Sequence, residues 1–210
     1  QPTAFPQAET QEKPWLMDPV NNGYYFPVPE RVDVRCQRQE SMHSSGRKAT
    51  EGDVAVAWID HGAAPEDAGY AYAIRPDTTA EALAQFAKAP DFEVVRRDDS
   101  AHIVRFLGQG ITGYVLFAPA DGLAVGAVRG VDVPCLVMER WEADRLVLAV
   151  SDPDLRLRKP TPGAIHEPGS EGRVNVQLNG RWEVVSGPGT AQVTDANTLH
   201  FTCRDGATVQ

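Results

Sequence analysis

FEVVRRDDSAHIVRFLGQGITGYVLFA, residues 92–118, decides the fold class of this chain. It contains three short runs rich in β-branched and aromatic residues, at 92–97, 101–106 and 112–118, and the polar residues 98–100 separate the first two. Runs of this length and composition between turn residues are typical of β-strands. The stretch therefore predicts consecutive strands joined by tight turns.

The same pattern continues on both sides of this stretch. Further strand-like runs occupy residues 31–37, 54–59, 70–75, 133–139, 145–150, 173–178, 181–185, 190–194 and 198–203. In the first of them, Val32 and Val34 alternate with Asp33 and Arg35, which is the two-residue period of a strand. Many short strands at regular spacing predict an all-β chain built as an antiparallel β-sandwich.

Two hairpins and one helix stand out in the local sequence. Asn179-Gly180 between alternating runs predicts a two-residue type I′ turn, and a polar turn is expected near Ala143-Asp144. One short helix is expected near 79–88, where Thr78 and Glu81 match a capping box. Leu83 and Phe86 would share a face of this helix, and Pro90 would end it.

The composition limits the classes of function. The 210 residues include 42% hydrophobic residues, which is a globular composition, and no apolar run reaches the roughly 18 residues of a membrane span. The net charge of −9 disfavours binding to nucleic acid or another polyanion, because such binding needs clustered lysine and arginine. We therefore expect neither a nucleic-acid nor a membrane partner.

Three widely spaced cysteines, Cys36, Cys135 and Cys203, show no metal-type spacing. Cys135 and Cys203 lie in strand-like runs, where a buried free thiol is the ordinary state, and one disulfide with a leftover thiol stays open as an alternative. The chain opens with QPTAFPQ, without an initiator methionine or an apolar signal segment. We expect either a removed leader or a piece of a longer chain, with residues 1–14 as a linker or tail.

One cluster resembles an acid–base site. Asp60, His61, Tyr70 and Tyr72 contain the groups that a β-eliminating enzyme would use. Their spacing also fits plain scaffold, because Asp60 and Gly62 are turn residues and the two tyrosines share one face of a strand. We favour the scaffold interpretation and assign no catalytic residue.

Other candidate groups are weaker. His43, His102, His166 and His200 show no metal-ligand spacing, and the acidic residues within 98–100 and 139–145 lie in turns. The chain has no nucleophile elbow, P-loop or dinucleotide fingerprint, so we expect no metal and no cofactor.

Basic and aromatic residues near the start of the chain suggest a sugar-binding surface. The stretch 31–48 has four arginines and a lysine, at Arg31, Arg35, Arg38, Arg47 and Lys48. Aromatic rings stack on sugar faces and arginine pairs with carboxylate or sulfate, so Arg35, Arg38, Tyr24 and Tyr25 are the candidate substrate-binding residues. A solvated strand face is the alternative, and it is the commoner use of such residues.

The order of several sequence blocks adds a resemblance. GYYFP (23–27), a block with DHG followed by Y-x-Y-x-I (60–74), and LVLAVSDPDL (146–155) occur in the order found in polysaccharide lyase family 8. The chain after Lys13 resembles the C-terminal part of that family, and its chondroitinase ABC branch above all.

The resemblance implies an architecture. Members of the family combine an N-terminal helical toroid, a central multi-sheet β-sandwich region and a C-terminal β-sandwich. Residues 15–89 would be the final strands of the central region, and residues 90–210 would be the C-terminal domain. The toroid and the rest of the central region would be the partners of this chain.

The resemblance also implies an activity for the complete enzyme. Such lyases cleave chondroitin sulfate, dermatan sulfate or hyaluronan by β-elimination at uronic acid, outside the cytoplasm, as secreted or periplasmic proteins. The family's catalytic residues have no counterpart in these 210 residues, so the chain would be a non-catalytic portion. Two rivals are a stand-alone polysaccharide-binding β-sandwich and a family member that acts on another uronate polymer such as xanthan.

Overall fold

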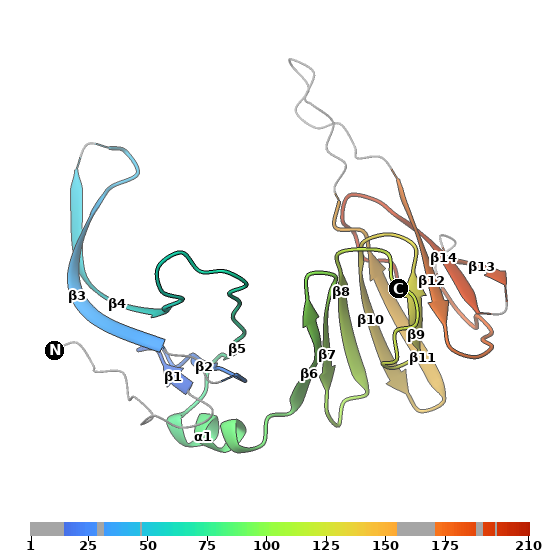
Figure 1. The fold of residues 1–210 in the computed structure, drawn as a ribbon, viewed down its shortest axis with the longest axis horizontal. Coiled ribbons are helices and arrows are strands. Elements are labelled where there is room, and N and C mark those ends of the chain that lie inside the picture. The colour runs from blue at the N-terminus through green and yellow to red at the C-terminus, as the bar shows by residue number, and fades with distance from the viewer. Residues whose placement is uncertain (1–14, 29–31, 47, 155–170, 188–190, 196) are drawn as a thin grey trace, which may run out of the picture. The chain divides into compact units, whose positions relative to one another are not determined.

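The computed structural model describes residues 15–28, 32–46, 48–154, 171–187, 191–195 and 197–210, with the backbone alone at 35–37 and 191–195. The chain divides into two compact units, Gln1–Pro90 and Asp91–Gln210. Every sheet in the described part is antiparallel, and one short helix accompanies them (Figure 1). The prediction of an all-β antiparallel fold with one short helix is therefore confirmed. The tail expected at 1–14 lies outside the described residues.

A small sheet organises the first unit. Its order is β1-β2-β5, with bounds β1 (Trp15–Met17), β2 (Gly23–Tyr25) and β5 (Ala73–Arg75). Asp18 closes the turn between β1 and β2, because its Oδ1 accepts the backbone N–H groups of Val20 at 2.9 Å and Asn22 at 2.8 Å. The strand expected at 70–75 is shorter than predicted, since only its last three residues pair.

A long hairpin forms the second sheet of this unit. Strands β3 (Val32–Met42) and β4 (Ala49–Ile59) pair without a bulge from Val32 opposite Ile59 to Met42 opposite Ala49. In the described part of the chain this sheet has only these two strands. Each strand therefore has one edge without a described neighbour.

Helix α1 comprises Ala80–Lys88. The predicted cap at Thr78 would start the helix at Thr79, one residue earlier. Thr79 caps it, with its side-chain oxygen accepting the N–H of Ala82 at 3.2 Å, so the prediction of Thr78 as the cap was wrong. The N–H of Thr78 instead donates to the carbonyl of Asn21 at 2.9 Å. No described helix has the length and apolarity needed to cross a membrane.

The helix packs on the small sheet through its predicted face. Leu83 is fully buried, and the edge of the Phe86 ring meets Tyr25 with the centroids 5.3 Å apart. Gly23 in β2 permits this approach, because a β-carbon there would lie 2.8 Å from the Leu83 side chain. The small sheet and the helix thus share a compact apolar contact.

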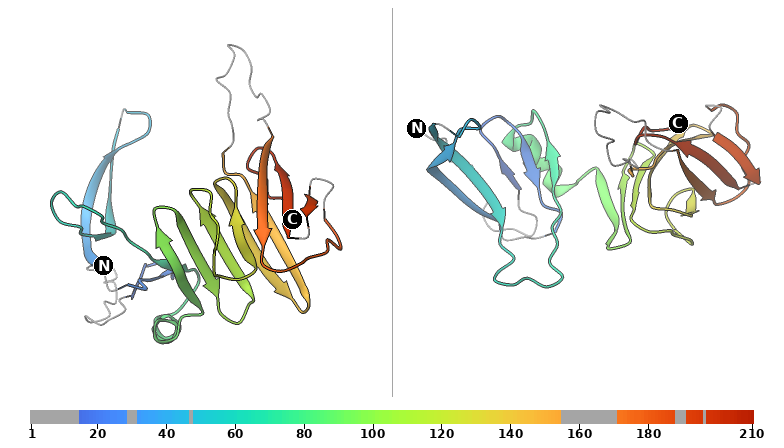
Figure 2. Two further views of the ribbon diagram at one scale, coloured as in Figure 1. Left: turned by 45° about the vertical axis from the view of Figure 1, so that its right-hand side comes forward. Right: turned by 90° about the horizontal axis from the view of Figure 1, so that it is seen from above.

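The second unit consists of two sheets that face each other (Figure 2). The five-stranded sheet has the order β11-β10-β8-β7-β6 and the other has the order β13-β14-β12-β9. Their bounds are β6 (Phe92–Asp98), β7 (Ala101–Phe106), β8 (Ile111–Leu116), β9 (Val128–Val131), β10 (Cys135–Glu142), β11 (Arg145–Ser151), β12 (Gly172–Leu178), β13 (Ala191–Asp195) and β14 (Thr198–Cys203).

The core of this unit lies between the two sheets. Ile103 and Val137 point inward from the five-stranded sheet, and Val174, Val176 and Phe201 from the other. Each is at most 3% exposed. Burying such side chains contributes about 1.5–3 kcal/mol each, and this shared burial holds the sandwich together.

One predicted hairpin is confirmed and the other was wrong. β10 and β11 are joined by Ala143 and Asp144, with Glu142 opposite Arg145, as expected. After Asn179-Gly180, however, residues 181–187 form no strand. Strand β12 already pairs with β14 on one side and β9 on the other, so neither edge is free for a returning strand.

The sequence predicted Trp182 to lie in a strand, but in the structure this residue has another role. Its indole N–H donates to the carbonyl of Asn179 at 2.7 Å, and its ring packs against Trp141 with centroids 5.7 Å apart. The segment after the turn therefore folds back as a cover for the core edge instead of extending the sheet.

A buried carboxylate joins β10 to the loop before β9. Glu139 is 1% exposed, and its Oε2 accepts the N–H groups of Ala127 at 2.8 Å and Val128 at 3.2 Å. A β-carbon at Gly126, which has φ +65°, would lie 1.9 Å from this carboxylate. The loop thus needs glycine at this position and a carboxylate beneath it.

Cys135 and Cys203 are buried free thiols, as the ordinary interpretation expected. Burial raises the pKa of Cys135 to about 12, and burial likewise raises the pKa of Cys203. Both residues belong to the core between the sheets. The side chain of Cys36 lies outside the described residues.

Candidate functional site

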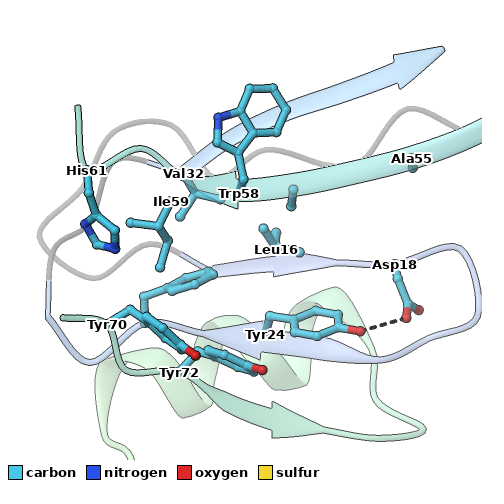
Figure 3. A pocket seen from close by; sticks show the side chains of 12 residues that line it. Leu16, Asp18, Tyr24, Val32, Ala55, Trp58, Ile59, His61, Tyr70 and Tyr72 are labelled. Carbon is cyan, nitrogen blue, oxygen red and sulfur yellow. Dashed lines mark hydrogen bonds between the residues drawn. The ribbon is translucent and has the colours of Figure 1, made fainter. Parts of the chain in front are cut away.

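A pocket in the first unit is the candidate functional site. It has a volume of about 560 Å³ and lies between the small sheet, the hairpin β3–β4 and the segment after β4 (Figure 3). Its lining is mainly apolar and aromatic: Leu16, Asp18, Tyr24, Phe26, Val32, Ala55, Ala57, Trp58, Ile59, His61, Tyr70 and Tyr72. We refer to it below as the aromatic pocket.

Tyrosine rings form one wall of the aromatic pocket. The rings of Tyr70 and Tyr72 lie nearly parallel, with centroids 6.1 Å apart and planes at 17°. Tyr72 also contacts Tyr24 at 6.4 Å and Phe26 at 6.3 Å. Tyr70 is 61% exposed and Tyr72 is 49% exposed, so this wall offers aromatic surface to a partner.

A polar pair lies at one side of the pocket. The hydroxyl of Tyr24 donates to Oδ2 of Asp18 at 3.3 Å (Figure 3). Burial, with the Asp18 charge beside it, raises the pKa of the Tyr24 phenol. Burial also acts to raise the pKa of Asp18, but hydrogen bonds from Asn22 and Val20 outweigh it, so this pKa lies below its ordinary value. Asp18 is therefore an anion at neutral pH.

The structure brings His61, Tyr70 and Tyr72 to one pocket, yet they do not form an acid–base relay. Asp60 accepts the N–H of Gly62 at 2.8 Å and closes the predicted turn. His61 has no hydrogen-bonding partner among the described residues. β-Elimination at a uronate also needs a group that neutralises the carboxylate, and none of the described residues that line the pocket is lysine or arginine.

The predicted substrate-binding residues occupy three different environments. Tyr24 lines the aromatic pocket, whereas Tyr25 is 1% exposed and packs on Phe86, which leaves its ring no free face for a sugar. Arg38 is exposed on β3 and does not line the pocket. Arg35 pairs in register with Val56, and its side chain lies outside the described residues. The sugar-binding surface stays a prediction.

Arg38 already has anionic partners. Its guanidinium lies 2.9 Å from Glu51 and 3.6 Å from Asp53, and a hydrogen bond to Glu51 raises its pKa. An arginine paired in this way has less charge to offer a sulfate or uronate. Arg31 and Arg47, the other arginines of the basic stretch, lie outside the described residues.

The other titratable residues have ordinary roles. His43 bonds to Ser45 at 3.0 Å, His200 bonds to Asn175 at 2.8 Å, and His102 packs edge-on against Phe117. His166 lies outside the described residues. Among the side chains that the structure describes, no group of three histidine, cysteine or acidic residues is placed to hold a metal.

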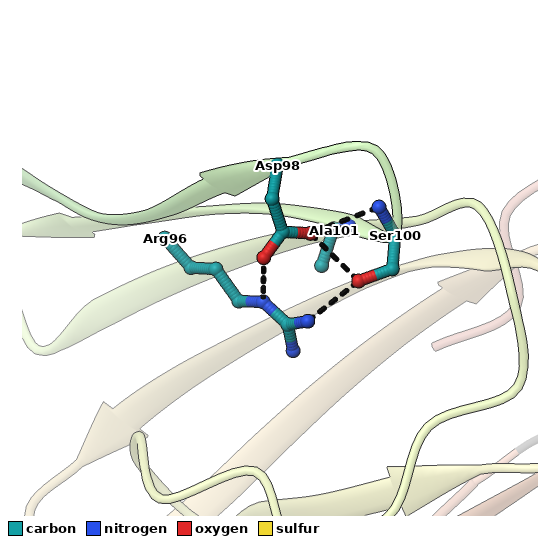
Figure 4. Close-up of polar contacts among 4 residues, drawn as sticks. All are labelled: Arg96, Asp98, Ser100 and Ala101. Atoms are coloured by element: carbon teal, nitrogen blue, oxygen red, sulfur yellow. Dashed lines mark hydrogen bonds and ion pairs between the residues drawn. The ribbon is translucent and has the colours of Figure 1, made fainter.

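The acidic turn at 98–100 is a structural device (Figure 4). Oδ1 of Asp98 accepts the N–H of Ser100 at 2.8 Å and that of Ala101 at 3.0 Å, and its Oδ2 accepts Arg96 Nε at 2.6 Å. The Arg96 guanidinium first, and then Ser100, hold the pKa of Asp98 well below its usual range. This carboxylate closes the β6–β7 turn, and its lone pairs are already engaged.

Sequence reasoning missed Asp18, Phe26 and Trp58 as members of the pocket. They come from three separate elements, and no local motif joins them. The one usable signal was the run 54–59, in which every residue is apolar although an exposed hairpin strand needs only alternate apolar positions. Such a run is typical of a strand that is covered on both faces.

Comparisons with known proteins show what this chain is similar to. Residues 2–87 match the super-sandwich domain of polysaccharide lyase family 8. A chondroitin sulfate ABC exolyase of Bacteroides thetaiotaomicron is 37% identical, and the match covers 94% of this chain and 22% of that protein. A chondroitin sulfate ABC endolyase of Proteus vulgaris is 32% identical, with 84% of this chain and 17% of that protein covered.

A solved structure supports the fold. The structure of a Paenibacillus xanthan lyase superposes with a TM-score of 0.72 at 20% identity, covering 98% of this chain and 20% of that one. The chain spans about a fifth of the length of the relatives it matches. With a super-sandwich match and relatives aligned over most of its residues, the chain belongs to polysaccharide lyase family 8.

Proposed function

We propose that this chain is the C-terminal, non-catalytic β-sandwich portion of a glycosaminoglycan lyase. The complete enzyme would cleave chondroitin sulfate, dermatan sulfate or hyaluronan by β-elimination at uronic acid. The observation that carries the proposal is the 37% identity to a chondroitin sulfate ABC exolyase over 94% of this chain. Family membership alone leaves the polymer open, and this relative favours chondroitin-type substrates.

The non-catalytic part of the proposal rests on the chemistry of the aromatic pocket. A base must remove the C5 proton of the uronate while a cation or strong hydrogen-bond donor neutralises the adjacent carboxylate. The described residues that line the pocket include His61 and tyrosines, and Asp18 is the only aspartate, glutamate, lysine or arginine among them. An anion beside a uronate opposes both binding and enolate formation.

In this proposal the two units have supporting roles. The first unit supplies the final strands of the central β-region, and the second is the C-terminal sandwich. The N-terminal helical toroid and the remaining central region of the same lyase are the partners, and the polysaccharide binds through the complete enzyme. In this proposal the complete enzyme is secreted or periplasmic.

A lyase assay tests the proposal. The 210-residue chain is incubated with chondroitin sulfate, the ultraviolet absorbance of the unsaturated uronate is followed, and an intact-mass spectrum excludes a longer species. We expect no activity from the chain alone. We expect activity when it replaces the matched region of the Bacteroides exolyase, because the catalytic groups would then come from the exolyase part.

Two variants serve as controls in that hybrid enzyme. His61→Ala and Tyr70→Phe should leave kcat within about twofold, because neither residue touches the reacting atoms in this proposal. Activity of the isolated chain that disappears in His61→Ala would overturn the non-catalytic assignment. An inactive but folded hybrid would overturn the assignment to a chondroitin-type lyase.

The second candidate, a stand-alone polysaccharide-binding module, is favoured by one observation. Tyr70 and Tyr72 present exposed rings, and such rings can stack on sugar faces. Isothermal titration of the chain with chondroitin sulfate oligosaccharides at low salt tests it. Binding that is lost in Arg38→Ala would support the module and the predicted site, whereas no binding removes it.

A further inference from the structure

We propose that Asn179 is a site of spontaneous modification, at which the side-chain amide is lost and aspartate and isoaspartate form, while Asn22 is protected from the same reaction. Asparagine precedes glycine at two places in the sequence, Asn22-Gly23 and Asn179-Gly180. Because the two pairs share the same chemistry, a difference between them comes from the fold. The inference goes beyond the proposed function and does not depend on it.

The reaction needs only the chain, hydroxide and water. The backbone nitrogen of the glycine loses its proton to hydroxide and attacks Cγ of the asparagine, so that an N–Cγ bond forms. The Cγ–Nδ2 bond then breaks, and the amide takes a proton from water and leaves as ammonia. Water adds to either carbonyl of the resulting cyclic imide and opens the ring, which gives aspartate or isoaspartate without oxidation or reduction. Glycine favours the attack because it has no β-carbon to obstruct it.

The pair Asn179-Gly180 is open to this reaction. Both residues are exposed and directly follow β12. Gly180 has φ +91°, and a β-carbon there would meet its nearest neighbouring atom at 3.9 Å, so the glycine has space around it. Within the described part of the chain no group accepts the Gly180 N–H. The leaving amide makes only a long contact, from Nδ2 of Asn179 to the Gly126 carbonyl at 3.5 Å.

The pair Asn22-Gly23 has the opposite surroundings. Asp18 accepts the backbone N–H of Asn22 at 2.8 Å and its Nδ2 at 2.8 Å, and the Asp18 N–H donates to the Asn22 carbonyl at 2.9 Å. Gly23 is buried in β2, the central strand of the small sheet, and pairs with Met17 and Arg75. The leaving amide is therefore held by a charge-assisted hydrogen bond, and the attacking nitrogen belongs to a backbone that is paired on both sides.

The product at Asn179 changes contacts of the second unit. The Asn179 N–H donates to the carbonyl of Ala127 at 2.8 Å, and the Asn179 carbonyl accepts the indole N–H of Trp182 at 2.7 Å. In isoaspartate the main chain runs through Cβ and Cγ, so it gains a carbon, and the former carbonyl becomes part of a free carboxylate. The segment that Trp182 attaches beside Trp141 is therefore loosened.

Incubation in water labelled with heavy oxygen tests the inference. The 210-residue chain is kept in mildly alkaline buffer, digested with an acid protease and mapped by mass spectrometry, so that labelled oxygen marks the molecules that reacted during the incubation. A sample unfolded in guanidinium chloride is the control, because both pairs are then free of the fold. Asn179→Gln is the matched variant, since its longer side chain closes a cyclic imide far more slowly.

In the folded chain we expect label at residue 179 to appear at least about tenfold faster than at residue 22, because reaction at Asn22 must break a charge-assisted bond and open the sheet. In the unfolded control the two rates should become comparable. Equal rates in the folded chain would overturn the inference. So would a folded chain without label at residue 179 when the unfolded control reacts there, or label at the same rate in Asn179→Gln.

The loosening has its own readout. Anion exchange separates the isoaspartate fraction, because the product has an additional negative charge. We expect this fraction to unfold at a lower denaturant concentration than the unmodified chain, followed by tryptophan fluorescence. An equal midpoint would overturn the loosening of the Trp182 segment.

Discussion

The two units of this chain use β-structure in different ways. In the second unit, two sheets turn apolar faces toward each other, and Ile103, Val137 and Val176 are almost completely buried. In the first unit, a three-stranded sheet and a hairpin border an open pocket, and Trp58 and Tyr70 remain exposed. The comparison teaches that the second unit encloses a core between its own two sheets, whereas the first unit leaves the space between its small sheet and its hairpin open as a pocket.

The largest expected effect compares one isoleucine from each unit. Ile103→Ala removes a fully buried side chain between the two sheets and should destabilise the second unit by about 3–4 kcal/mol, because it leaves a cavity. Ile59→Ala removes a half-buried side chain beside an existing pocket and should cost about 1 kcal/mol.

Hydrogen exchange read by mass spectrometry separates the two units in this comparison, because a single unfolding midpoint need not describe both. Amides of β7 and β8 report Ile103→Ala, and amides of β4 report Ile59→Ala. Equal losses of protection in the two variants would mean that the first unit also has a closed core.

The second prediction concerns the buried carboxylate of the second unit. Glu139→Ala leaves the N–H groups of Ala127 and Val128 without their acceptor and should cost about 2–3 kcal/mol. Glu142→Ala on the same strand removes only a half-exposed ion pair with Arg140, and we expect little change.

Denaturant unfolding followed by tryptophan fluorescence measures the stability of Glu139→Ala and Glu142→Ala, because Trp141 and Trp182 lie in the second unit. A stability loss in Glu142→Ala as large as that in Glu139→Ala would show that the loop before β9 does not depend on the buried carboxylate.

The third prediction sharpens the account of the first unit. Thr79→Ala removes the side-chain acceptor of the Ala82 N–H and should destabilise helix α1 by about 1 kcal/mol. Thr78→Ala tests the cap that the sequence favoured. This change should lower the stability of the helix much less, because the described hydrogen bond from Thr78 to Asn21 is donated by the backbone N–H, which alanine keeps. Exchange rates of the first-turn amides of α1 distinguish the two, and a larger effect in Thr78→Ala would contradict the observed cap.

Local patterns predicted most strands, and the errors have specific causes. The runs at 92–97 and 101–106 were correct because their turn, through Asp98, is encoded within a few residues. The Asn179-Gly180 hairpin was wrong because strand pairing is decided by which edges are free, and β9 and β14 occupy both edges of β12. No property of residues 173–185 alone contains that information.

Strand β9 was missed because its four residues, interrupted by Gly130, give little pattern. That glycine is nevertheless needed, because a β-carbon there would lie 2.4 Å from the Ala120 carbonyl oxygen.

The site was harder to predict than the fold. The aromatic pocket joins Asp18, Trp58 and Tyr70 across the first unit. Only the folded chain brings them together, so sequence reasoning emphasised the arginines of β3 instead.

The smallest expected effect compares two carboxylates that close turns, one in each unit. Asp18 accepts backbone N–H groups in the first unit, and Asp98 accepts backbone N–H groups and the Arg96 guanidinium in the second. Both folded-state pKa values lie below the unfolded value of about 3.9, that of Asp98 by more. Each anion therefore contributes stability that is fully present above that unfolded pKa and is lost as pH falls through the folded pKa.

Asp98→Asn and Asp18→Asn measure this difference when the stability of each variant is compared with that of the unmodified chain from pH 7 to pH 2. The difference should be constant between pH 7 and about pH 5 for both variants and should shrink below about pH 4. The stability difference for Asp98→Asn should persist to lower pH than that for Asp18→Asn. The reason is that the Arg96 guanidinium lowers the pKa of Asp98 more strongly than the amides around Asp18 lower the pKa of Asp18. If the Asp18 difference outlasted that of Asp98 on acidification, the Arg96 ion pair would not be what stabilises the β6–β7 turn.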